Sequence, residues 1–72
     1  MKIVVNGVWR ELPGDEAAEQ PPTLARALLG LGYGDRIVAT ALNGEFVAAQ
    51  ARAQTRIADG DRLEVLAPMQ GG

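Results

Sequence analysis

Residues 3–8 read IVVNGV, and this stretch decides the fold. A β-branched run favours a strand. An Asn-Gly pair directly after it is a strong hairpin signal, because both residues tolerate the positive φ of a tight type I′ turn. Residues 8–12, VWREL, then return as a second strand in which apolar and polar side chains roughly alternate. The chain is therefore predicted to begin with an antiparallel hairpin.

The same signal recurs in the second half of the chain. An Asn-Gly pair at 43–44 separates a nearly continuous apolar run, RIVATAL at 36–42, from a short strand candidate, EFV at 45–47. An unbroken apolar run is typical of a strand in the middle of a sheet. Further on, the Asp-Gly-Asp triplet at 59–61 predicts a tight turn before a last strand at 62–66.

A single helix is predicted between the two hairpins. Thr23 is a good N-cap, and the prolines just before it bar an earlier start. Apolar side chains follow at i, i+3, i+4 and i+7, on one face of a helix of about two to three turns. They are Leu24, Ala27, Leu28 and Leu31. Gly32 or Gly34 is expected at the C′ position, just past the last helical turn. Because so short a helix would not hold alone in water, it must lie on the sheet.

Two segments carry no clear pattern. Residues 15–22 are acidic and contain prolines without periodicity, so a loop is expected there. Residues 48–56 are alanine-rich, and either a helical turn or a loop would fit them. A short 3₁₀ or α turn is the favoured interpretation of this second segment.

The predicted order β-β-α-β-β-β defines the fold class. It is α+β: a mixed sheet of four to five strands with one main helix in its concave face, the β-grasp or ubiquitin-like roll. We expect a β-grasp domain over residues 1–66 and a flexible C-terminal tail over 67–72. So short a chain has no second layer for the other face of the sheet, so apolar side chains there are candidates for a partner surface. Trp9 and Phe46 are the possible members of that surface, although the core is favoured for Phe46.

The composition excludes several classes of function. The 72 residues include no cysteine and no histidine, which removes disulfides, iron–sulfur clusters, thiolate metal sites and the commonest general base. The net charge is −2 without any basic run, so no nucleic acid partner is expected. The N-terminal residues form no long apolar segment, so neither a signal peptide nor a membrane partner is expected, and the lack of cysteine fits a cytoplasmic location.

The sequence stops on Gly71-Gly72. Without Cβ atoms, two such residues form a slim, flexible thread whose α-carboxylate can enter a narrow enzyme cleft. A frayed end that happens to be glycine is the plain alternative. The sequence suggests no nucleophile–base pair and no phosphate cradle. We therefore expect no catalytic and no metal-binding residues in this chain.

Four stretches together resemble one known family. They are MKIVVNG at 1–7, LNGEFV at 42–47, DGDRLEV at 59–65 and the final Gly71-Gly72. In this order they resemble the ThiS family, the bacterial sulfur carrier proteins of thiamine biosynthesis, and the resemblance covers the whole chain. Members usually carry a Pro-Arg pair after the valine of the second hairpin, where this sequence has two alanines.

The resemblance implies chemistry at the C-terminus. An E1-like adenylyltransferase of the ThiF type would adenylate the carboxylate of Gly72. Sulfur from a donor protein would then replace AMP and leave a thiocarboxylate, which a thiazole synthase of the ThiG type would use for thiazole formation. Gly71, Gln70 and Met69 would give the tail access to its partners. By this resemblance the chain would be a carrier and substrate protein and not an enzyme. It would bind no cofactor itself, since ATP and Mg²⁺ would be used by the partner enzyme.

Three other functions stay open at this point. A sulfur carrier of the molybdopterin synthase small-subunit type shares the fold and the diglycine end. A ubiquitin-like protein modifier would instead form isopeptide bonds through Gly72. A β-grasp binding module would use no terminal chemistry and would have no need for the two glycines.

Overall fold

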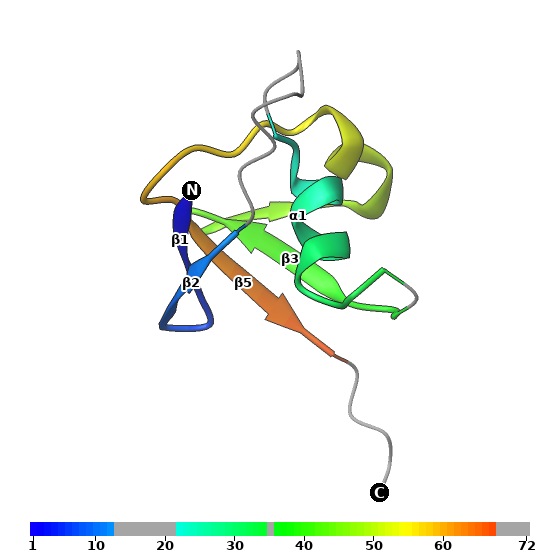
Figure 1. Ribbon diagram of the computed structural model, residues 1–72. Coiled ribbons are helices and arrows are strands. Elements are labelled where there is room, and N and C mark those ends of the chain that lie inside the picture. The colour runs from blue at the N-terminus through cyan, green and yellow to red at the C-terminus, as the bar shows by residue number, and fades with distance from the viewer. Residues whose placement is uncertain (13–21, 35, 68–72) are drawn as a thin grey trace, which may run out of the picture.

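The computed structural model describes residues 1–12, 22–34 and 36–67. The elements follow the predicted order, with one addition, a 3₁₀ helix called η1 (Figure 1). Their bounds are β1 Lys2–Val5, β2 Val8–Glu11, α1 Leu24–Gly30, β3 Ala39–Leu42, β4 Glu45–Val47, η1 Ala49–Gln54 and β5 Arg62–Leu66. The loop predicted over 15–22 lies outside the described residues, apart from Pro22.

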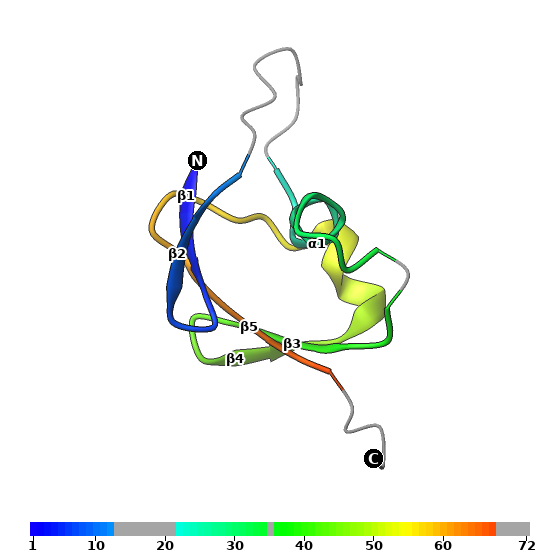
Figure 2. The same ribbon diagram turned by 60° about the horizontal axis from the view of Figure 1, so that its bottom comes forward.

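The five strands form one mixed sheet in the order β2-β1-β5-β3-β4. β1 and β5 pair in parallel, and the other neighbouring strands pair antiparallel. The two strands that flank the helix, β2 and β3, consequently run in the same direction without being neighbours, as a crossover connection requires. The sheet curves around α1, and η1 lies beside α1 on the same side (Figure 2). The β-grasp prediction is confirmed.

Both hairpins turn on the predicted Asn-Gly pairs. Asn6 and Gly7 have φ values of 51° and 83°, and Asn43 and Gly44 have values of 52° and 85°. All four residues occupy the left-handed region that a type I′ turn requires. These turns therefore set the register of β1 with β2 and of β3 with β4.

The helix begins and ends where the sequence predicts. The Thr23 hydroxyl accepts a hydrogen bond from the backbone N–H of Arg26 at 3.3 Å. At the other end, the N–H of Tyr33 donates to the Leu28 carbonyl at 2.8 Å, and the N–H of Gly32 donates to the Leu29 carbonyl at 3.1 Å. With φ of 92° at Gly32, this pattern is a Schellman motif with glycine at C′.

The core lies between α1 and one face of the sheet. It combines alternate side chains of β1 and β5 with the predicted apolar face of the helix. Its buried apolar members are Ile3, Val5, Leu12, Leu24, Ala27, Leu28, Ile57, Leu63 and Val65. Leu31, predicted for the same face, is half-buried and packs against this core.

The apolar run at 36–42 was predicted as one strand, and this is wrong for its first half. β3 begins only at Ala39, and Ile37 is 84% exposed. Val38, next to it, packs against the core. The reason is that Ala39 pairs with Leu66, the last residue of β5, so β5 provides no strand residue opposite the residues before Ala39.

The alanine-rich segment forms the 3₁₀ helix η1, one of the two turns, 3₁₀ or α, that the sequence favoured there. Arg52 fastens it to the sheet, because its Nη2 donates to the Val38 carbonyl at 2.6 Å and its Nε donates to Thr40 Oγ1 at 3.1 Å. The Thr40 hydroxyl in turn donates to the Val47 carbonyl at 2.8 Å. Within the ranges described above, no helix is long and apolar enough to cross a membrane.

Candidate functional site

The predicted tail follows directly from β5, the central strand of the sheet. β5 lies between β1 and β3, with Val4 opposite Arg62 on one side and Ala39 opposite Leu66 on the other. It is the last element of the chain and leads towards the C-terminus (Figure 1). The C-terminal end of β5 is therefore the base of the tail.

The start of β5 is fixed by the predicted Asp-Gly-Asp turn. Asp59 Oδ1 accepts a hydrogen bond from the N–H of Lys2 at 2.8 Å, and Asp61 Oδ2 accepts one from the N–H of Ala58 at 2.8 Å. Gly60, with φ of 86°, donates its N–H to the Lys2 carbonyl. The two carboxylates thus bind backbone N–H groups. Across the part of the chain that is described, no group of three His, Cys, Asp or Glu side chains could hold a metal ion.

Asn43 fixes the same end of β5 from the side of β3. Its Oδ1 accepts from the N–H of Arg62 at 2.9 Å, and its Nδ2 donates to Asp61 Oδ1 at 3.1 Å. Its own N–H donates to the Arg62 carbonyl at 2.7 Å. The asparagine of the second hairpin therefore has two roles, as a turn residue and as an anchor for β5.

The face of the sheet that α1 does not cover is here called the open face. Residues paired in register project from the same face. Val4 pairs with both Trp9 and Arg62, and Ala41 pairs with both Glu64 and Phe46. Val4, Arg62 and Glu64 alternate with buried residues of β1 and β5, so they and the residues paired with them belong to the open face. The two charged side chains lie in its centre, with an aromatic side chain on each edge strand.

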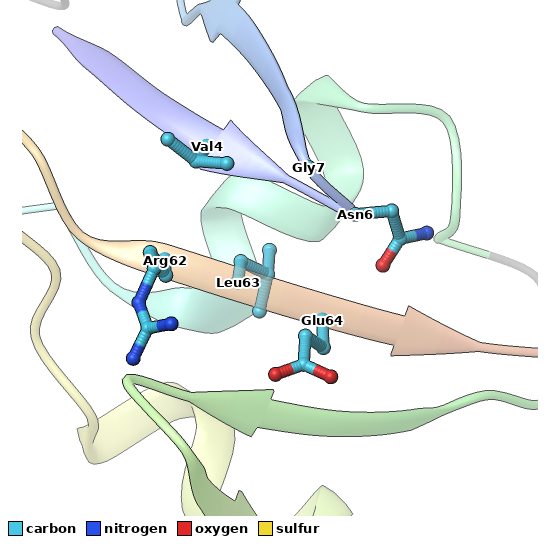
Figure 3. Close-up of a pocket in the computed structure, with 6 residues that line it drawn as sticks. All are labelled: Val4, Asn6, Gly7, Arg62, Leu63 and Glu64. Atoms are coloured by element: carbon cyan, nitrogen blue, oxygen red, sulfur yellow. The ribbon is translucent and has the colours of Figure 1, made fainter.

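A shallow pocket of about 230 Å³ opens on this face beside β5. It lies between β5 and the first hairpin, and it is lined by Val4, Asn6, Gly7, Arg62, Leu63 and Glu64. Figure 3 shows Arg62 and Glu64 projecting from the same side of β5, with α1 behind the sheet. The pocket therefore presents both a positive and a negative group close to the strand that carries the tail.

Gly72, Gly71, Gln70 and Met69 lie outside the described residues. Their roles, and the flexibility expected of residues 67–72, remain predictions. The described part of the site is the base of the tail at the end of β5, together with the open face.

The two aromatic candidates are both exposed, Trp9 to 63% and Phe46 to 73%. The preference for Phe46 in the core is wrong, because Phe46 pairs with Ala41 on the open face. The structure places these rings on opposite edge strands and does not bring them together.

Sequence reasoning did not single out four further large apolar side chains that are exposed, namely Val8, Leu29, Ile37 and Leu66. Leu66 pairs with Ala39 on the open face. The signal that could have found it is strand alternation, since Leu63 and Val65 are buried and their neighbours must point the other way. Leu66 places an apolar side chain of the open face immediately before the tail.

Comparison with known proteins gives one consistent family. The model of the ThiS family matches residues 3–72 of the chain. A crystal structure of the thiamine biosynthesis protein ThiS from Geobacter metallireducens is 32% identical, with a TM-score of 0.75 and coverage of 100% of both chains. An NMR structure of a thiamine biosynthesis protein from the same organism is 30% identical, with a TM-score of 0.76, and covers 100% of this chain and 88% of that one.

A longer relative is also similar. A thiazole synthase from Paramagnetospirillum magneticum (strain ATCC 700264 / AMB-1) is 40% identical over 73 residues. The match covers 100% of this chain and 20% of the relative, so the chain spans about a fifth of that protein's length.

Proposed function

Since this chain belongs to the ThiS family of sulfur carrier proteins in thiamine biosynthesis, we propose that its terminal glycine is the group that carries the sulfur. In this proposal the carboxylate of Gly72 is adenylated and then converted to a thiocarboxylate, which donates sulfur for thiazole formation. The chain acts as a carrier and is itself the substrate of its partner enzymes.

The proposed reaction starts from an unreactive group. A C-terminal carboxylate is ionised at neutral pH and is a poor electrophile. An E1-like adenylyltransferase of the ThiF type joins it to AMP, with ATP and Mg²⁺ bound by that enzyme and pyrophosphate as the leaving group. A sulfur donor protein then supplies the sulfur that displaces AMP. Gly71 keeps the thread narrow enough for the enzyme's cleft, and Gln70 and Met69 lie in the approach to it.

The observation that carries this proposal is the extent of the family match. It runs from residue 3 to residue 72 and so includes the Gly-Gly pair and the whole sheet except Lys2. Two structures named for thiamine biosynthesis share the fold at 30% identity or more. These similarities favour the thiamine carrier over the molybdopterin carrier and the protein modifier.

The thiazole synthase relative supports the proposed acceptor of the sulfur. In that protein, a segment 40% identical to this chain lies within a polypeptide that bears the synthase name. A carrier and its acceptor enzyme work on the same thiocarboxylate, so their presence in one polypeptide suits successive steps. We accordingly infer that a thiazole synthase of the ThiG type is a partner of this chain.

Intact-mass measurement tests the proposal directly. Incubated with ATP, Mg²⁺, the E1-like adenylyltransferase and a sulfur donor, the protein should gain about 16 Da as one carboxylate oxygen is exchanged for sulfur. Tandem mass spectrometry should place the gain on Gly72. A covalent adduct to lysine side chains of other proteins would indicate a modifier instead.

Two tail variants serve as controls for this experiment. A variant with one alanine added after Gly72 and a variant that lacks Gly72 should both keep the fold, because the described core is built by α1 and the sheet and chain ends generally tolerate such changes. Both should fail to gain the mass. If either variant gains the mass on a group other than its new C-terminal carboxylate, the modified group is not the terminal carboxylate and the proposal is wrong.

A further inference from the structure

β5 continues past the point where its neighbour β1 turns away. The parallel pairing of the two strands ends at Val5 opposite Leu63, and β1 then reverses at Asn6. The last backbone bond between them runs from the N–H of Asn6 to the Leu63 carbonyl at 2.9 Å. β5 itself extends to Leu66. Without another partner, Val65 would have no neighbour on the side of β5 that faces β1.

The side chain of Asn6 takes the place of the missing strand. Its Oδ1 accepts from the N–H of Val65 at 2.8 Å, and its Nδ2 donates to the Val65 carbonyl at 3.1 Å. Had β1 continued, one backbone carbonyl and one backbone N–H would have made these two bonds. Figure 3 shows the Asn6 amide beside β5, just past the end of β1.

Val65 is consequently the last residue that is held on both sides. Its side chain is buried in the core, and on the other edge it is paired with Thr40 of β3. Leu66 has only β3 beside it, through Ala39, and its side chain is exposed. Everything after Leu66 belongs to the predicted tail.

Asparagine suits this position for two independent reasons. Its backbone tolerates the left-handed conformation, with φ of 51°, that the turn requires. Its amide offers both a donor and an acceptor, whereas an ionised aspartate offers acceptors only. A glycine at the same position would preserve the turn and lose both side-chain bonds.

We propose that Asn6 is a positioning residue for the sulfur-transfer tail. By clamping Val65, it fixes the point from which residues 66–72 extend, a reach of at most about 25 Å for seven residues. Loss of the clamp frees one edge of β5 at Val65, so the terminal carboxylate is presented less accurately to the adenylating enzyme. The proposal rests on the proposed function of Gly72.

The second hairpin provides a matched control. Asn43 occupies an equivalent Asn-Gly turn with φ of 52°, and its side chain also makes two hydrogen bonds at β5, but at the start of the strand. Asn6→Gly and Asn43→Gly should therefore cost similar amounts of stability, and only the former should alter the base of the tail.

The test combines NMR with adenylation kinetics on the full-length protein. In Asn6→Gly, the backbone amides of Val65 and Leu66 should exchange faster and have lower order parameters than in Asn43→Gly. The kcat/KM for adenylation should fall by about threefold or more in Asn6→Gly, and by less than about twofold in Asn43→Gly. Asn6→Asp keeps the acceptor for the Val65 N–H, so its amide exchange and its kcat/KM should lie between those of Asn6→Gly and the wild type. It replaces Asn6→Gly if that variant does not fold.

The outcomes separate this inference from the proposed function. Wild-type protein that is not adenylated at all overturns the proposed function. Equal exchange of the Val65 and Leu66 amides in the two glycine variants, or equal loss of kcat/KM in both, overturns the positioning role of Asn6.

Discussion

At the scale of single residues, polar side chains connect segments that the sequence pattern treats as separate. Thr40 is 1% exposed, yet its hydroxyl is fully used, since it accepts from Arg52 of η1 and donates to Val47 of β4. Neither bond is visible in the sequence, where Thr40 interrupts an apolar run. A buried hydroxyl with both partners in place contributes to stability, and losing it is costly because its half-buried partners each lose a hydrogen bond.

Replacing Thr40 by valine should destabilise the fold. The two side chains have similar volumes, so the change mainly removes the hydroxyl that serves Arg52 and the Val47 carbonyl. The free energy of unfolding should fall by about 1–3 kcal/mol, measured by urea denaturation. Thr55→Val is the control, because the Thr55 hydroxyl serves only the Ala51 carbonyl and its residue is half-buried. A loss in Thr40→Val no larger than in the control would contradict the assignment.

At the scale of elements, two glycines at the end of α1 look alike in the sequence but differ in backbone conformation. Gly30 is the last residue of the helix, and Gly32 follows as C′ with φ of 92°. A Cβ added to either would meet no atom within 4 Å. Any difference between alanine substitutions at the two positions must therefore come from the backbone.

The two substitutions should have opposite effects. Gly30→Ala should stabilise the protein by up to about 1 kcal/mol, since alanine is the better helix former. Gly32→Ala should destabilise it by about 1 kcal/mol, because a Cβ is unfavourable in the left-handed region. Thermal unfolding followed by circular dichroism checks both, with Tm rising in the first variant and falling in the second. A shift of Tm in the same direction in both would show that the Schellman geometry is wrong.

Local chemistry explains which elements could be predicted. The two hairpins and α1 depend on neighbouring residues, namely Asn-Gly turns, a threonine cap and a glycine at C′. By contrast, η1 is attached through bonds from Arg52 to Val38 and Thr40, which are 14 and 12 residues away. The start of β3 depends on its pairing with a neighbouring strand of the sheet. Such elements are decided by tertiary contacts, so a single sequence supports only a guess.

At the scale of the whole molecule, the sheet order decides which parts of the site could be foreseen. The diglycine end was evident from the sequence. The environment of Phe46 was not, because β4 has three residues and its orientation follows only from pairing with β3. The clamp between Asn6 and Val65 spans 59 residues, so no local pattern could reveal it. A surface assembled from edge and central strands can be recognised only when the order of those strands in the sheet is known.

The open face leads to a prediction about partner binding. Phe46 is 73% exposed at one edge of this face, so Phe46→Ser should change the free energy of unfolding by less than about 0.5 kcal/mol. If the open face contacts the E1-like adenylyltransferase, the same change should weaken binding by about fivefold or more, measured by isothermal titration calorimetry. Exposed aromatic side chains are common anchors in interfaces, because they bury a large apolar area.

Leu29 offers a matched control for this experiment. It is 67% exposed, but it lies on α1, which covers the opposite face of the sheet. Leu29→Ser should therefore leave the affinity for the adenylyltransferase unchanged while removing a similar amount of exposed apolar surface. Equal weakening in the two variants would point to a general loss of hydrophobic contact. Unchanged affinity in Phe46→Ser would show that the enzyme binds the tail without using this edge of the open face.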